Sequence, residues 1–320
     1  MSVHSVYNVF VMEKMNQKRI LIYGSGAIGC YFGGKLVQNG FDVTFVARKN
    51  LEDLKQNGLT IKENNTLANF PINVVSNTQD LGTFDYIFMC VKSKDTKSAT
   101  KQILENIAEN TSVVSFQNGV DNEEIIGSVI GIDKVIGASL YIAAKVTGLA
   151  TVETTGIVYI EVGELNRTRT DRILELQNIL RTSGIDCNIS LDIWAELWHK
   201  LIRNASINPI STLSRKTVGE ILDDKESCEL LKNTMLEVKH VAFLNGINID
   251  DEIVDFHLQN LQGYRSFKTS MLQDFEAGRP LELDELVGVV IRKAKEKNIS
   301  VPNLEMIYNQ IKEKTSVSVK

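Results

Sequence analysis

The residues from 195 to 210, AELWHKLIRNASINPI, carry polar side chains at a spacing that could serve catalysis. Lys200, Asn204 and Asn208 follow one another at four-residue steps, which places them on one face of a helix. A lysine can donate a proton and stabilise negative charge that develops on an oxygen atom, and asparagine amides can bind hydroxyl and carboxylate groups. The same pattern would also suit a solvated helix face, so other parts of the chain must decide between the two interpretations.

The other face of this segment is apolar and predicts a helix that packs on a core. Its apolar residues recur at three- and four-residue steps: Trp194, Leu197, Trp198, Leu201 and Ala205. We expect this helix to cover residues 192–207, because Pro209 disfavours helical geometry at Asn208. Asparagine is a poor helix former, so two asparagines on one face call for a reason beyond helix formation.

A glycine-rich turn near the start of the chain indicates a dinucleotide-binding unit. The apolar run KRILIY (18–23) leads directly into GSGAIG, then a helical stretch ending near residues 39–40, then the apolar run FDVTFVAR (41–48). This strand–turn–helix–strand context makes the GxGxxG match specific. Gly24 allows the tight turn, Gly26 lets the backbone approach a pyrophosphate, and Gly29 lets the helix lie close to the strand. The N-terminus of the helix would then face the phosphates.

The residues that follow the second apolar run indicate which of the two nicotinamide dinucleotides the chain binds. An acidic residue at this position would bind a ribose 2′-hydroxyl, whereas an arginine accommodates a 2′-phosphate. The sequence VARKN places Arg48 and Lys49 here, with no acid before Glu52. We therefore predict NADP rather than NAD as the cofactor, the alternative being that Arg48 is only a surface cation.

Further apolar runs extend the predicted sheet, and polar residues gather where these runs end. The runs lie within 86–91, 111–120 and 135–144, and they end near Lys92, Gln117–Asn118–Gly119 and Ala143–Ala144. Open α/β sheets bind ligands outside the carboxyl ends of their strands, so we expect these residues to lie along the ligand edge. The segment 152–164 predicts a hairpin that turns at Thr155–Gly156.

Beyond residue 190 the sequence predicts an all-α domain. Helical periodicity runs through 192–207, 216–245, 250–276 and 283–297. The third of these segments carries an apolar stripe (Tyr264, Phe267, Met271 and Phe275) and a polar stripe (Ser266, Ser270 and Asp274). Gly278 and Pro280 end it, and Glu282 begins the next helix, where an acid suits the positive N-terminus. The predicted fold is an α/β Rossmann-type domain over 19–189 followed by an all-α domain over 190–320.

Composition narrows the class of protein further. The 320 residues are 43% apolar and carry a net charge of −5, so we expect neither nucleic acid nor a membrane as partner. The four histidines and four cysteines show no metal-ligand spacing, and we expect no metal. Cys30 and Cys90 lie within apolar stretches, which favours a reducing, cytoplasmic location. Residues 1–18 lack a basic start and a cleavage site, and we interpret them as an N-terminal extension.

Four segments together resemble the ketopantoate reductase (2-dehydropantoate 2-reductase) family. They are ILIYGSGAIGCYFG (20–33), SFQNGV (115–120), ELWHKLIRNASINPIS (196–211) and SMLQDFEAGRPLELD (270–284). The resemblance covers the chain from Arg19 to about Asn303, and its helical motifs are far more specific than the glycine turn. It implies an NADPH-dependent reduction of the 2-oxo acid ketopantoate to pantoate, toward pantothenate and coenzyme A. It also implies an active site in the cleft between a Rossmann domain and a helical domain.

The resemblance implies a role for each matching residue. Lys200 matches the general acid that protonates the ketone oxygen as hydride arrives, and Glu282 matches an acid at the cofactor and active site. The matching substrate-binding residues are Asn118, Asn204, Asn208 and Ser270. The matching cofactor contacts are Gly24, Ser25, Gly26, Ala27, Ile28, Gly29, Arg48, Lys92, Asn118, Ala144 and Glu282.

Three positions depart from the family pattern and leave the substrate open. Phe267 stands where many family members have asparagine, three residues before Ser270 on the same expected helix. Val218 stands where some members have asparagine, and Val287 stands where asparagine is frequent. We therefore expect a less polar pocket, and a 2-oxo acid with a bulkier apolar tail is an alternative substrate. A non-catalytic NADP sensor is a second alternative, disfavoured because the lysine, the amides and the glutamate are all kept together. The helical domain could also supply the interface of a homodimer.

Overall fold

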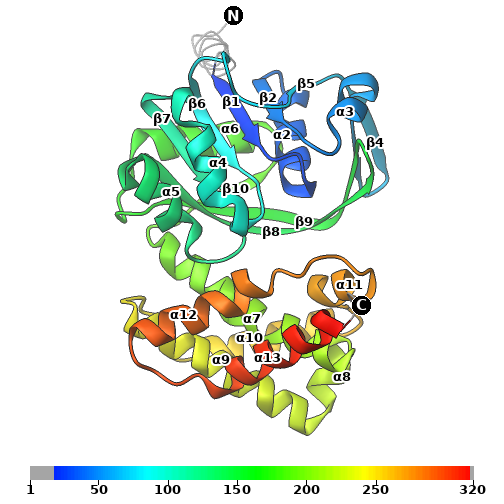
Figure 1. Cartoon of the computed structure of the whole chain (residues 1–320), viewed down its shortest axis with the longest axis vertical. Helices are drawn as coiled ribbons and strands as arrows, with labels where there is room; N and C mark the ends of the chain where they lie inside the picture. Colours follow the sequence, from blue (N-terminus) through cyan, green and yellow to red (C-terminus); the bar gives the residue numbers. More distant parts are fainter. Residues whose placement is uncertain (1–17, 318–320) are drawn as a thin grey trace, which may run out of the picture. The chain divides into compact units, whose positions relative to one another are not determined.

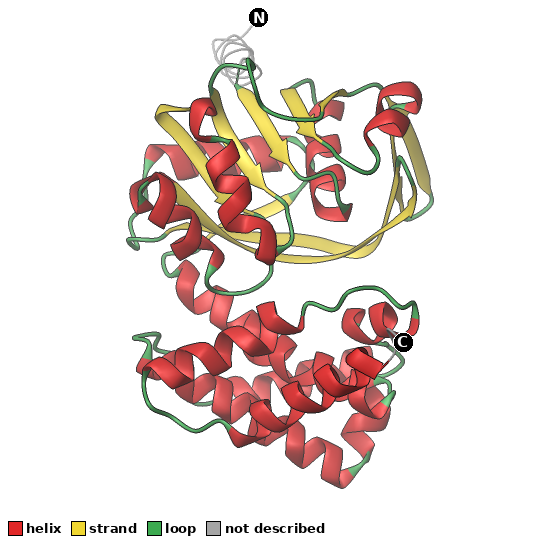
Figure 2. Ribbon diagram, viewed as in Figure 1, coloured by secondary structure: helices red, strands yellow, loops and turns green. Residues whose placement is uncertain are grey.

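Residues 18–317 are described by a computed structural model, and they form two compact units that divide between Ile193 and Trp194. The sequence places this boundary between residues 189 and 190. Apart from Lys18, the expected extension over residues 1–18 lies outside the described residues. Figure 1 follows the described elements from β1 to α13, and Figure 2 shows a sheet with helices in the first unit and helices joined by loops in the second. The predicted fold class is therefore confirmed.

A single mixed sheet organises the first unit. It has ten strands in the order β4-β3-β9-β8-β7-β6-β1-β2-β5, with β10 pairing to β9. The strands are β1 (Arg19–Tyr23), β2 (Asp42–Val46), β3 (Leu59–Glu63), β4 (Thr66–Phe70), β5 (Asn73–Val75), β6 (Phe84–Met89), β7 (Ile107–Ser115), β8 (Val135–Gly148), β9 (Thr151–Glu164) and β10 (Asp186–Ile189).

The parallel part of this sheet has the order of a dinucleotide-binding fold. β5, β2, β1, β6, β7 and β8 lie side by side in that order, and each pairs with its neighbours in parallel. Numbered along the chain, these strands follow the order 3-2-1-4-5-6 of Rossmann sheets. The order reverses between β1 and β6, and ligands of such sheets bind outside the carboxyl ends of the strands at this point.

Helices cover both faces of this sheet (Figure 1). They are α2 (Ala27–Gln38), α3 (Leu51–Asn57), α4 (Thr96–Gln102), α5 (Asn122–Ile130) and α6 (Asp171–Thr182), with the 3-10 segments η1 (Ser93–Asp95), η2 (Leu104–Asn106) and η3 (Ile132–Lys134). Side chains alternate across β1 as the pleat requires. Ile20 and Ile22 pack in one core with residues of α2 and α6, whereas Leu21 and Tyr23 pack in a second core with residues of α4 and α5. β1 is thus buried on both faces.

The predicted hairpin at Thr155–Gly156 is wrong. Residues 151–164 form one strand, β9, which pairs antiparallel with β8, and the chain reverses at residues 149–150 instead. Gly156 has a φ of +80°, a value that favours glycine. The strand absorbs this conformation as an irregularity, with a register shift between Tyr141 and Ala143 of β8.

The second unit is all-helical within the described residues. Its elements are α7 (Ile193–Ser214, which begins at the last residue of the first unit), α8 (Val218–Asp223), α9 (Lys225–Leu244), α10 (Ile253–Leu261), the 3-10 segment η4 (Gln262–Tyr264), α11 (Ser270–Glu276), the π-helical segment η5 (Asp284–Gly288), α12 (Val289–Glu296) and α13 (Pro302–Val317).

Two of the expected long helices are divided by polar residues. Within 216–245, α8 and α9 separate at Asp224, whose ψ of 111° is extended. Within 250–276, α10 is followed by η4 and a loop, and Thr269 caps a new helix by accepting a hydrogen bond from Leu272 N at 3.3 Å. The expectation that Phe267 and Ser270 share a helix is therefore wrong, since Ser270 is the first residue of α11 and Phe267 lies in the preceding loop.

The helix that carries the lysine and the asparagines is longer than expected. α7 continues to Ser214 with Pro209 inside it. Ile207 and Ile210 flank this proline and are each only 3% exposed. Burial of these neighbours offsets the loss of a helical hydrogen bond at Pro209, so the helix passes through residue 208 instead of ending before it.

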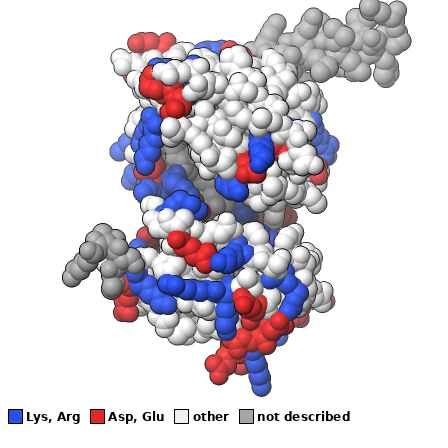
Figure 3. Space-filling model, turned by 90° about the vertical axis from the view of Figure 1, so that its right-hand side faces the viewer, with Lys and Arg blue, Asp and Glu red and all other residues white. Residues whose placement is uncertain are grey.

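The surface shows acidic and basic side chains mixed with one another. Figure 3 shows blue and red atoms interspersed with uncharged residues over the face in view, in keeping with the net charge of −5. No helix among residues 18–317 combines the length and the apolar character needed to cross a membrane.

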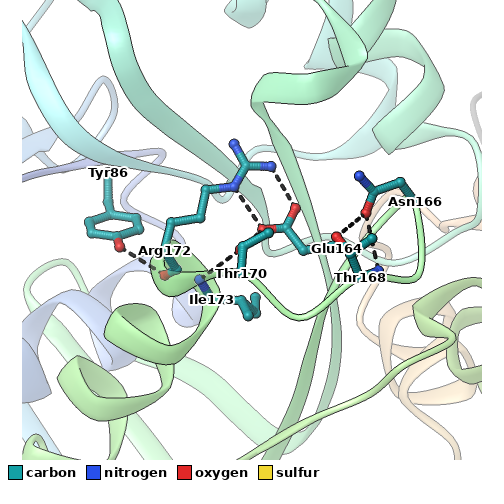
Figure 4. A network of polar contacts seen from close by, with 7 residues as sticks. All are labelled: Tyr86, Glu164, Asn166, Thr168, Thr170, Arg172 and Ile173. Carbon is teal, nitrogen blue, oxygen red and sulfur yellow. Dashed lines mark hydrogen bonds and ion pairs between the residues drawn. The ribbon is translucent and has the colours of Figure 1, made fainter.

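A buried carboxylate fixes the turn between β9 and α6 (Figure 4). Glu164 is 2% exposed and accepts hydrogen bonds from Arg172 Nε at 2.8 Å and Nη2 at 2.5 Å. The hydroxyl of Thr170 also donates to Glu164, and it caps α6 by accepting a bond from Ile173 N. The hydroxyl of Tyr86 donates to the Arg172 carbonyl at 3.0 Å. The hydrogen bonds to Glu164 raise the pKa of Arg172, so its guanidinium group stays charged.

We expect Arg172→Met to lower the free energy of unfolding by about 3 kcal/mol, because it leaves the buried Glu164 carboxylate without its charge partner. Arg169→Met, at an exposed arginine, should change the same quantity by less than about 0.5 kcal/mol. Urea unfolding followed by circular dichroism measures both. Equal stability of the two variants would contradict the expectation.

Candidate active site

The glycine turn lies where the sheet order reverses. Gly24 follows β1 directly, has a φ of +116°, and donates from its N–H to the Val46 carbonyl at 3.3 Å. A Cβ atom on Gly24 would lie 2.9 Å from the carbonyl carbon and oxygen of Cys90, which follows β6. Only glycine combines this backbone conformation with so close an approach. The turn is thereby held between the carboxyl ends of β2 and β6.

The other two glycines of the motif serve opposite purposes. A Cβ atom on Gly29 would lie 1.9 Å from the Gly24 carbonyl oxygen, so only glycine lets α2 approach β1 this closely. A Cβ atom on Gly26, the N-cap of α2, would meet nothing within 4 Å. No side chain caps α2, and its first turn has no acidic residue. The N–H groups at this end are therefore left without a side-chain cap or a carboxylate in the first turn, and they suit the pyrophosphate of a dinucleotide.

Asn50, which the sequence did not single out, holds this turn in place by two hydrogen bonds. Asn50 accepts a hydrogen bond from Ser25 Oγ at 2.6 Å and donates from Nδ2 to the Ser25 carbonyl at 3.1 Å. Asn50 is also the N-cap of α3, but its side chain makes no capping bond there. An asparagine just before a helix can be recognised in the sequence. The sequence would, however, predict that its side chain caps the helix, not that it bonds to the glycine turn.

Arg48 lies at the end of β2, where a 2′-phosphate would be bound. It is exposed and follows the buried Ala47. Burial raises the pKa of Tyr23 at the end of β1, and the neighbouring Arg48 opposes that rise. The guanidinium thus lies near the phenol of Tyr23 and close to the turn.

Buried and partly buried hydrogen bonds hold together the loops that follow β6 and β7. Gln117 Nε2 donates to the Val91 carbonyl at 2.9 Å and to Thr96 Oγ1 at 2.7 Å. The carbonyl of Asn118 accepts from Ser93 Oγ and from Asn122 Nδ2, each at 2.8 Å. These bonds fix the backbone on which Asn118 stands.

Three further residues complete the description of this part of the first unit. Lys92 is exposed and begins the same loop as the N-cap of η1. Ala144 is half-buried in the antiparallel β8–β9 ribbon, opposite Thr154. Glu123, the second residue of α5, is fully buried, and burial raises its pKa to about 7. Nothing in the amino-acid sequence singles out Glu123.

In the second unit, α7 presents the lysine and both asparagines on one continuous helix. Lys200 and Asn204 are half-buried, and Asn208 is 8% exposed. The apolar side of the helix is buried as predicted, with Trp198, Leu201 and Ala205 each at most 2% exposed. A fully solvated face does not fit this burial, and the interpretation as a site is favoured.

Ser270 and Glu282 each stand near the start of another helix of the same unit. Ser270 is exposed in the first turn of α11, directly after the capping residue Thr269. Glu282 is half-buried, and its carbonyl accepts from Leu286 N at 3.2 Å. The π-helical segment η5 begins two residues later at Asp284, which accepts hydrogen bonds from Tyr308 and Lys312 of α13. π-helical turns are frequent at functional sites, and this one fixes the backbone next to Glu282.

Of the three positions that were expected to make the pocket less polar, only one has an exposed side chain. Val218 is 1% exposed and Val287 is 0% exposed, so both side chains belong to the core of the helical unit. The expectation that they make the pocket less polar is therefore wrong. Phe267 is 43% exposed, and its carbonyl accepts from Val218 N at 3.1 Å. Phe267 alone of the three can face a substrate.

The structure thus brings the predicted residues into two groups. In the first unit, the glycine turn, Arg48, Lys92 and Asn118 all follow the ends of neighbouring parallel strands. In the second, Lys200 and two asparagines share α7. Among residues 18–317, no group of three or more His, Cys, Asp or Glu side chains is placed to hold a metal ion. The individual roles of these residues stay predictions.

The first unit combines a Rossmann-type sheet with a turn that suits a pyrophosphate, and the second unit presents a lysine and two amides on one helix. Together these features define a dinucleotide-dependent oxidoreductase. The sequence family described as "Ketopantoate reductase PanE/ApbA" matches residues 20–167, and the one described as "Ketopantoate reductase PanE/ApbA C terminal" matches residues 192–315. The chain belongs to the ketopantoate reductase family.

Named relatives match this chain across both units. The 2-dehydropantoate 2-reductase of Mesorhizobium japonicum is 30% identical over 311 residues, which cover 90% of this chain and 95% of that protein. The protein of the same name from a Nostoc species is 27% identical and covers 93% of this chain and 95% of its own length. A crystal structure of 2-dehydropantoate 2-reductase from Geobacter metallireducens matches with a TM-score of 0.87 at 29% identity, covering 93% of this chain and 100% of that chain.

We expect Gly26→Ala and Gly29→Ala to fail in different ways. Gly26→Ala should fold with an unchanged melting temperature, because the new methyl group meets nothing within 4 Å, yet it should bind NADPH at least about tenfold more weakly. Gly29→Ala should lower the melting temperature, because its methyl group would overlap the Gly24 carbonyl. Thermal unfolding and NADPH fluorescence titration test both. Unchanged NADPH affinity in Gly26→Ala would place the pyrophosphate elsewhere.

Proposed function

We propose that this chain is an NADPH-dependent reductase that converts ketopantoate to pantoate, with Lys200 as the proton donor. The observation that carries the proposal is the continuous helix α7, which presents Lys200, Asn204 and Asn208 at four-residue steps. Membership in the ketopantoate reductase family and relatives named 2-dehydropantoate 2-reductase support the substrate. The expected place of the reaction is the biosynthesis of pantothenate and coenzyme A.

The reaction requires a proton at the ketone oxygen as the carbonyl carbon accepts a hydride. Bound NADPH supplies that hydride. Lys200 donates the proton, and its positive charge stabilises the oxygen while negative charge develops there. The half-buried setting of Lys200 favours this role, because a partly desolvated ammonium group interacts more strongly with negative charge that develops on the oxygen.

The remaining predicted residues hold the substrate and the cofactor. The amides of Asn204 and Asn208 bind the hydroxyl and carboxylate groups of the substrate without adding a charge beside Lys200. Ser270 contributes a hydroxyl, and Asn118 lies on a loop whose backbone is held by hydrogen bonds. Glu282 supplies a carboxylate that positions the ammonium group of Lys200.

Most of the proposed cofactor contacts lie in the first unit, and Glu282 of the second unit is a further one. The turn from Gly24 to Gly29 binds the pyrophosphate at the N-terminus of α2. Arg48 binds the 2′-phosphate of NADPH, since no acidic residue stands at the end of β2 to bind a free 2′-hydroxyl. Lys92 and Ala144 complete the proposed contacts.

A second candidate substrate is a 2-oxo acid with a bulkier apolar tail. The observation that favours it is Phe267, an aromatic side chain that is 43% exposed where the family often has asparagine. An exposed aromatic ring would pack against an apolar tail and could not hydrogen-bond a hydroxyl group.

We also propose a cytoplasmic homodimer that forms through the helical unit. Leu236 and Phe243 on α9 and Phe256 on α10 are 44%, 62% and 54% exposed, and an interface between two copies of the helical unit would bury these apolar side chains. All four cysteines are free thiols, which suits a reducing compartment. Sedimentation equilibrium that finds only a monomer would remove the dimer from this proposal.

The first test of the function is NADPH oxidation at 340 nm with ketopantoate, 2-oxoisovalerate and a bulkier 2-oxo acid. We expect fast turnover with ketopantoate. Fast turnover with only the bulkier acid would favour the second candidate. Binding of NADPH without turnover of any acid would contradict the enzyme and support a sensor.

We expect Lys200→Met to lower kcat by about 10²–10⁴-fold, because the proton donor is lost while the apolar stem is kept. NADPH affinity should be unchanged, since Lys200 is not among the proposed cofactor contacts. Lys225→Met, at an exposed lysine at the start of α9, is the matched control and should keep full activity. Near-normal turnover of Lys200→Met would show that another group donates the proton.

A further inference from the structure

We propose, on the basis of the function above, that His257 is a positioning residue for the proton donor Lys200. His257 lies on α10, and its Nε2 atom is 2.9 Å from the carbonyl oxygen of His199 on α7. That oxygen belongs to the peptide group that joins His199 to Lys200. The contact therefore acts on the backbone from which the Lys200 side chain begins.

The surroundings of His257 determine which form of the ring makes this bond. A carbonyl oxygen only accepts hydrogen bonds, so Nε2 must carry a proton. The side chain is 6% exposed, and the buried Nδ1 atom has no hydrogen-bond partner among the described residues. Burial, together with the charge of Arg203, lowers the pKa of His257 to about 4. The ring is thus a neutral donor at neutral pH and adds no positive charge near Lys200.

Two features of α7, the helix that His257 contacts, weaken its regular backbone hydrogen bonding or bend it. Pro209 has no N–H, so the carbonyl of Ala205 lacks the partner that an ordinary residue would supply. Ser206 Oγ donates to the Ile202 carbonyl at 2.8 Å, a contact that tends to bend helices. Ser206 and Pro209 lie about 1.7 and 2.5 helical turns beyond Lys200. A bond from a neighbouring helix restrains the turn that carries the proton donor.

α10 is firmly packed and can serve as the fixed partner. Ile253, Val254 and Leu261 are at most 5% exposed and belong to the buried residues of this helix. The separation of His257 and His199 by 58 positions also means that the bond joins two distinct helices. A displacement of about 1 Å at a catalytic group is enough to slow a reaction strongly, so this restraint bears on turnover.

Three variants separate positioning from simple core packing. His257→Leu fills the space but has no donor, whereas His257→Gln offers an amide N–H that can reach the same carbonyl. His240→Leu, at an exposed histidine on α9, is the control. If His257→Leu does not fold, His257→Asn replaces it, because its shorter amide stops short of the carbonyl.

We expect His257→Leu to lower kcat at least about tenfold, with KM for the 2-oxo acid within about threefold and NADPH affinity unchanged. The primary isotope effect with deuterated NADPH should rise as the chemical step becomes slower. His257→Gln should recover most of the lost kcat, and His240→Leu should match the wild type. Equal kcat values for the leucine and glutamine variants, or wild-type kcat for the leucine variant, would overturn the proposal.

Hydrogen exchange of the α7 backbone gives a readout that does not need turnover. Amides around Lys200 should exchange faster in His257→Leu than in His257→Gln, and equal exchange in both would overturn the restraint. If the wild type turns over none of the 2-oxo acids, the proposed function fails, and the exchange data still decide whether His257 restrains α7.

Discussion

The contact between Gly29 and the Gly24 carbonyl leaves no room for a side-chain atom, and the arrangement of the first unit depends on it. Because α2 approaches β1 this closely, its N-terminus lies beside the end of that strand. The parallel order then places the ends of β2, β6 and β7 along the same edge of the sheet. The segments that carry Arg48, Lys92 and Asn118 all start there. A backbone contact thus determines where these side chains begin.

The helical unit arranges its functional groups in another way. Lys200, Asn204 and Asn208 are placed by one helix, in which four residues rise by about 6 Å. Spacing on a helix is more regular than spacing between loops, but it depends on the helix remaining intact through Pro209. Burial of Ile207 and Ile210 keeps it intact. The two units therefore use loop ends at a sheet edge in one case and a packed helix face in the other.

The sequence predicted those parts of the fold that depend on local pattern, such as the glycine turn, α2 and the helical second unit. It failed at Gly156, a residue type that is common in turns but here lies within β9. The strand continues through Gly156 because the β9 residues before and after it both pair with β8. It also failed at Val218 and Val287, since only tertiary packing decides that they are buried. The roles of the site residues came from a family resemblance. Asn50 and His257 were missed because their partners are 25 and 58 positions away.

The double hydrogen bond between Asn50 and Ser25 ties together two parts of cofactor recognition. The loop after β2 carries Arg48, which stands where the adenosine ribose would be distinguished, and two residues later Asn50 braces the turn assigned to the pyrophosphate. Exchange of this loop to alter the choice between the two nicotinamide dinucleotides would therefore also loosen the phosphate turn. We therefore expect a loop exchange that replaces Asn50 to weaken the binding of either cofactor as well as to change the preference between them.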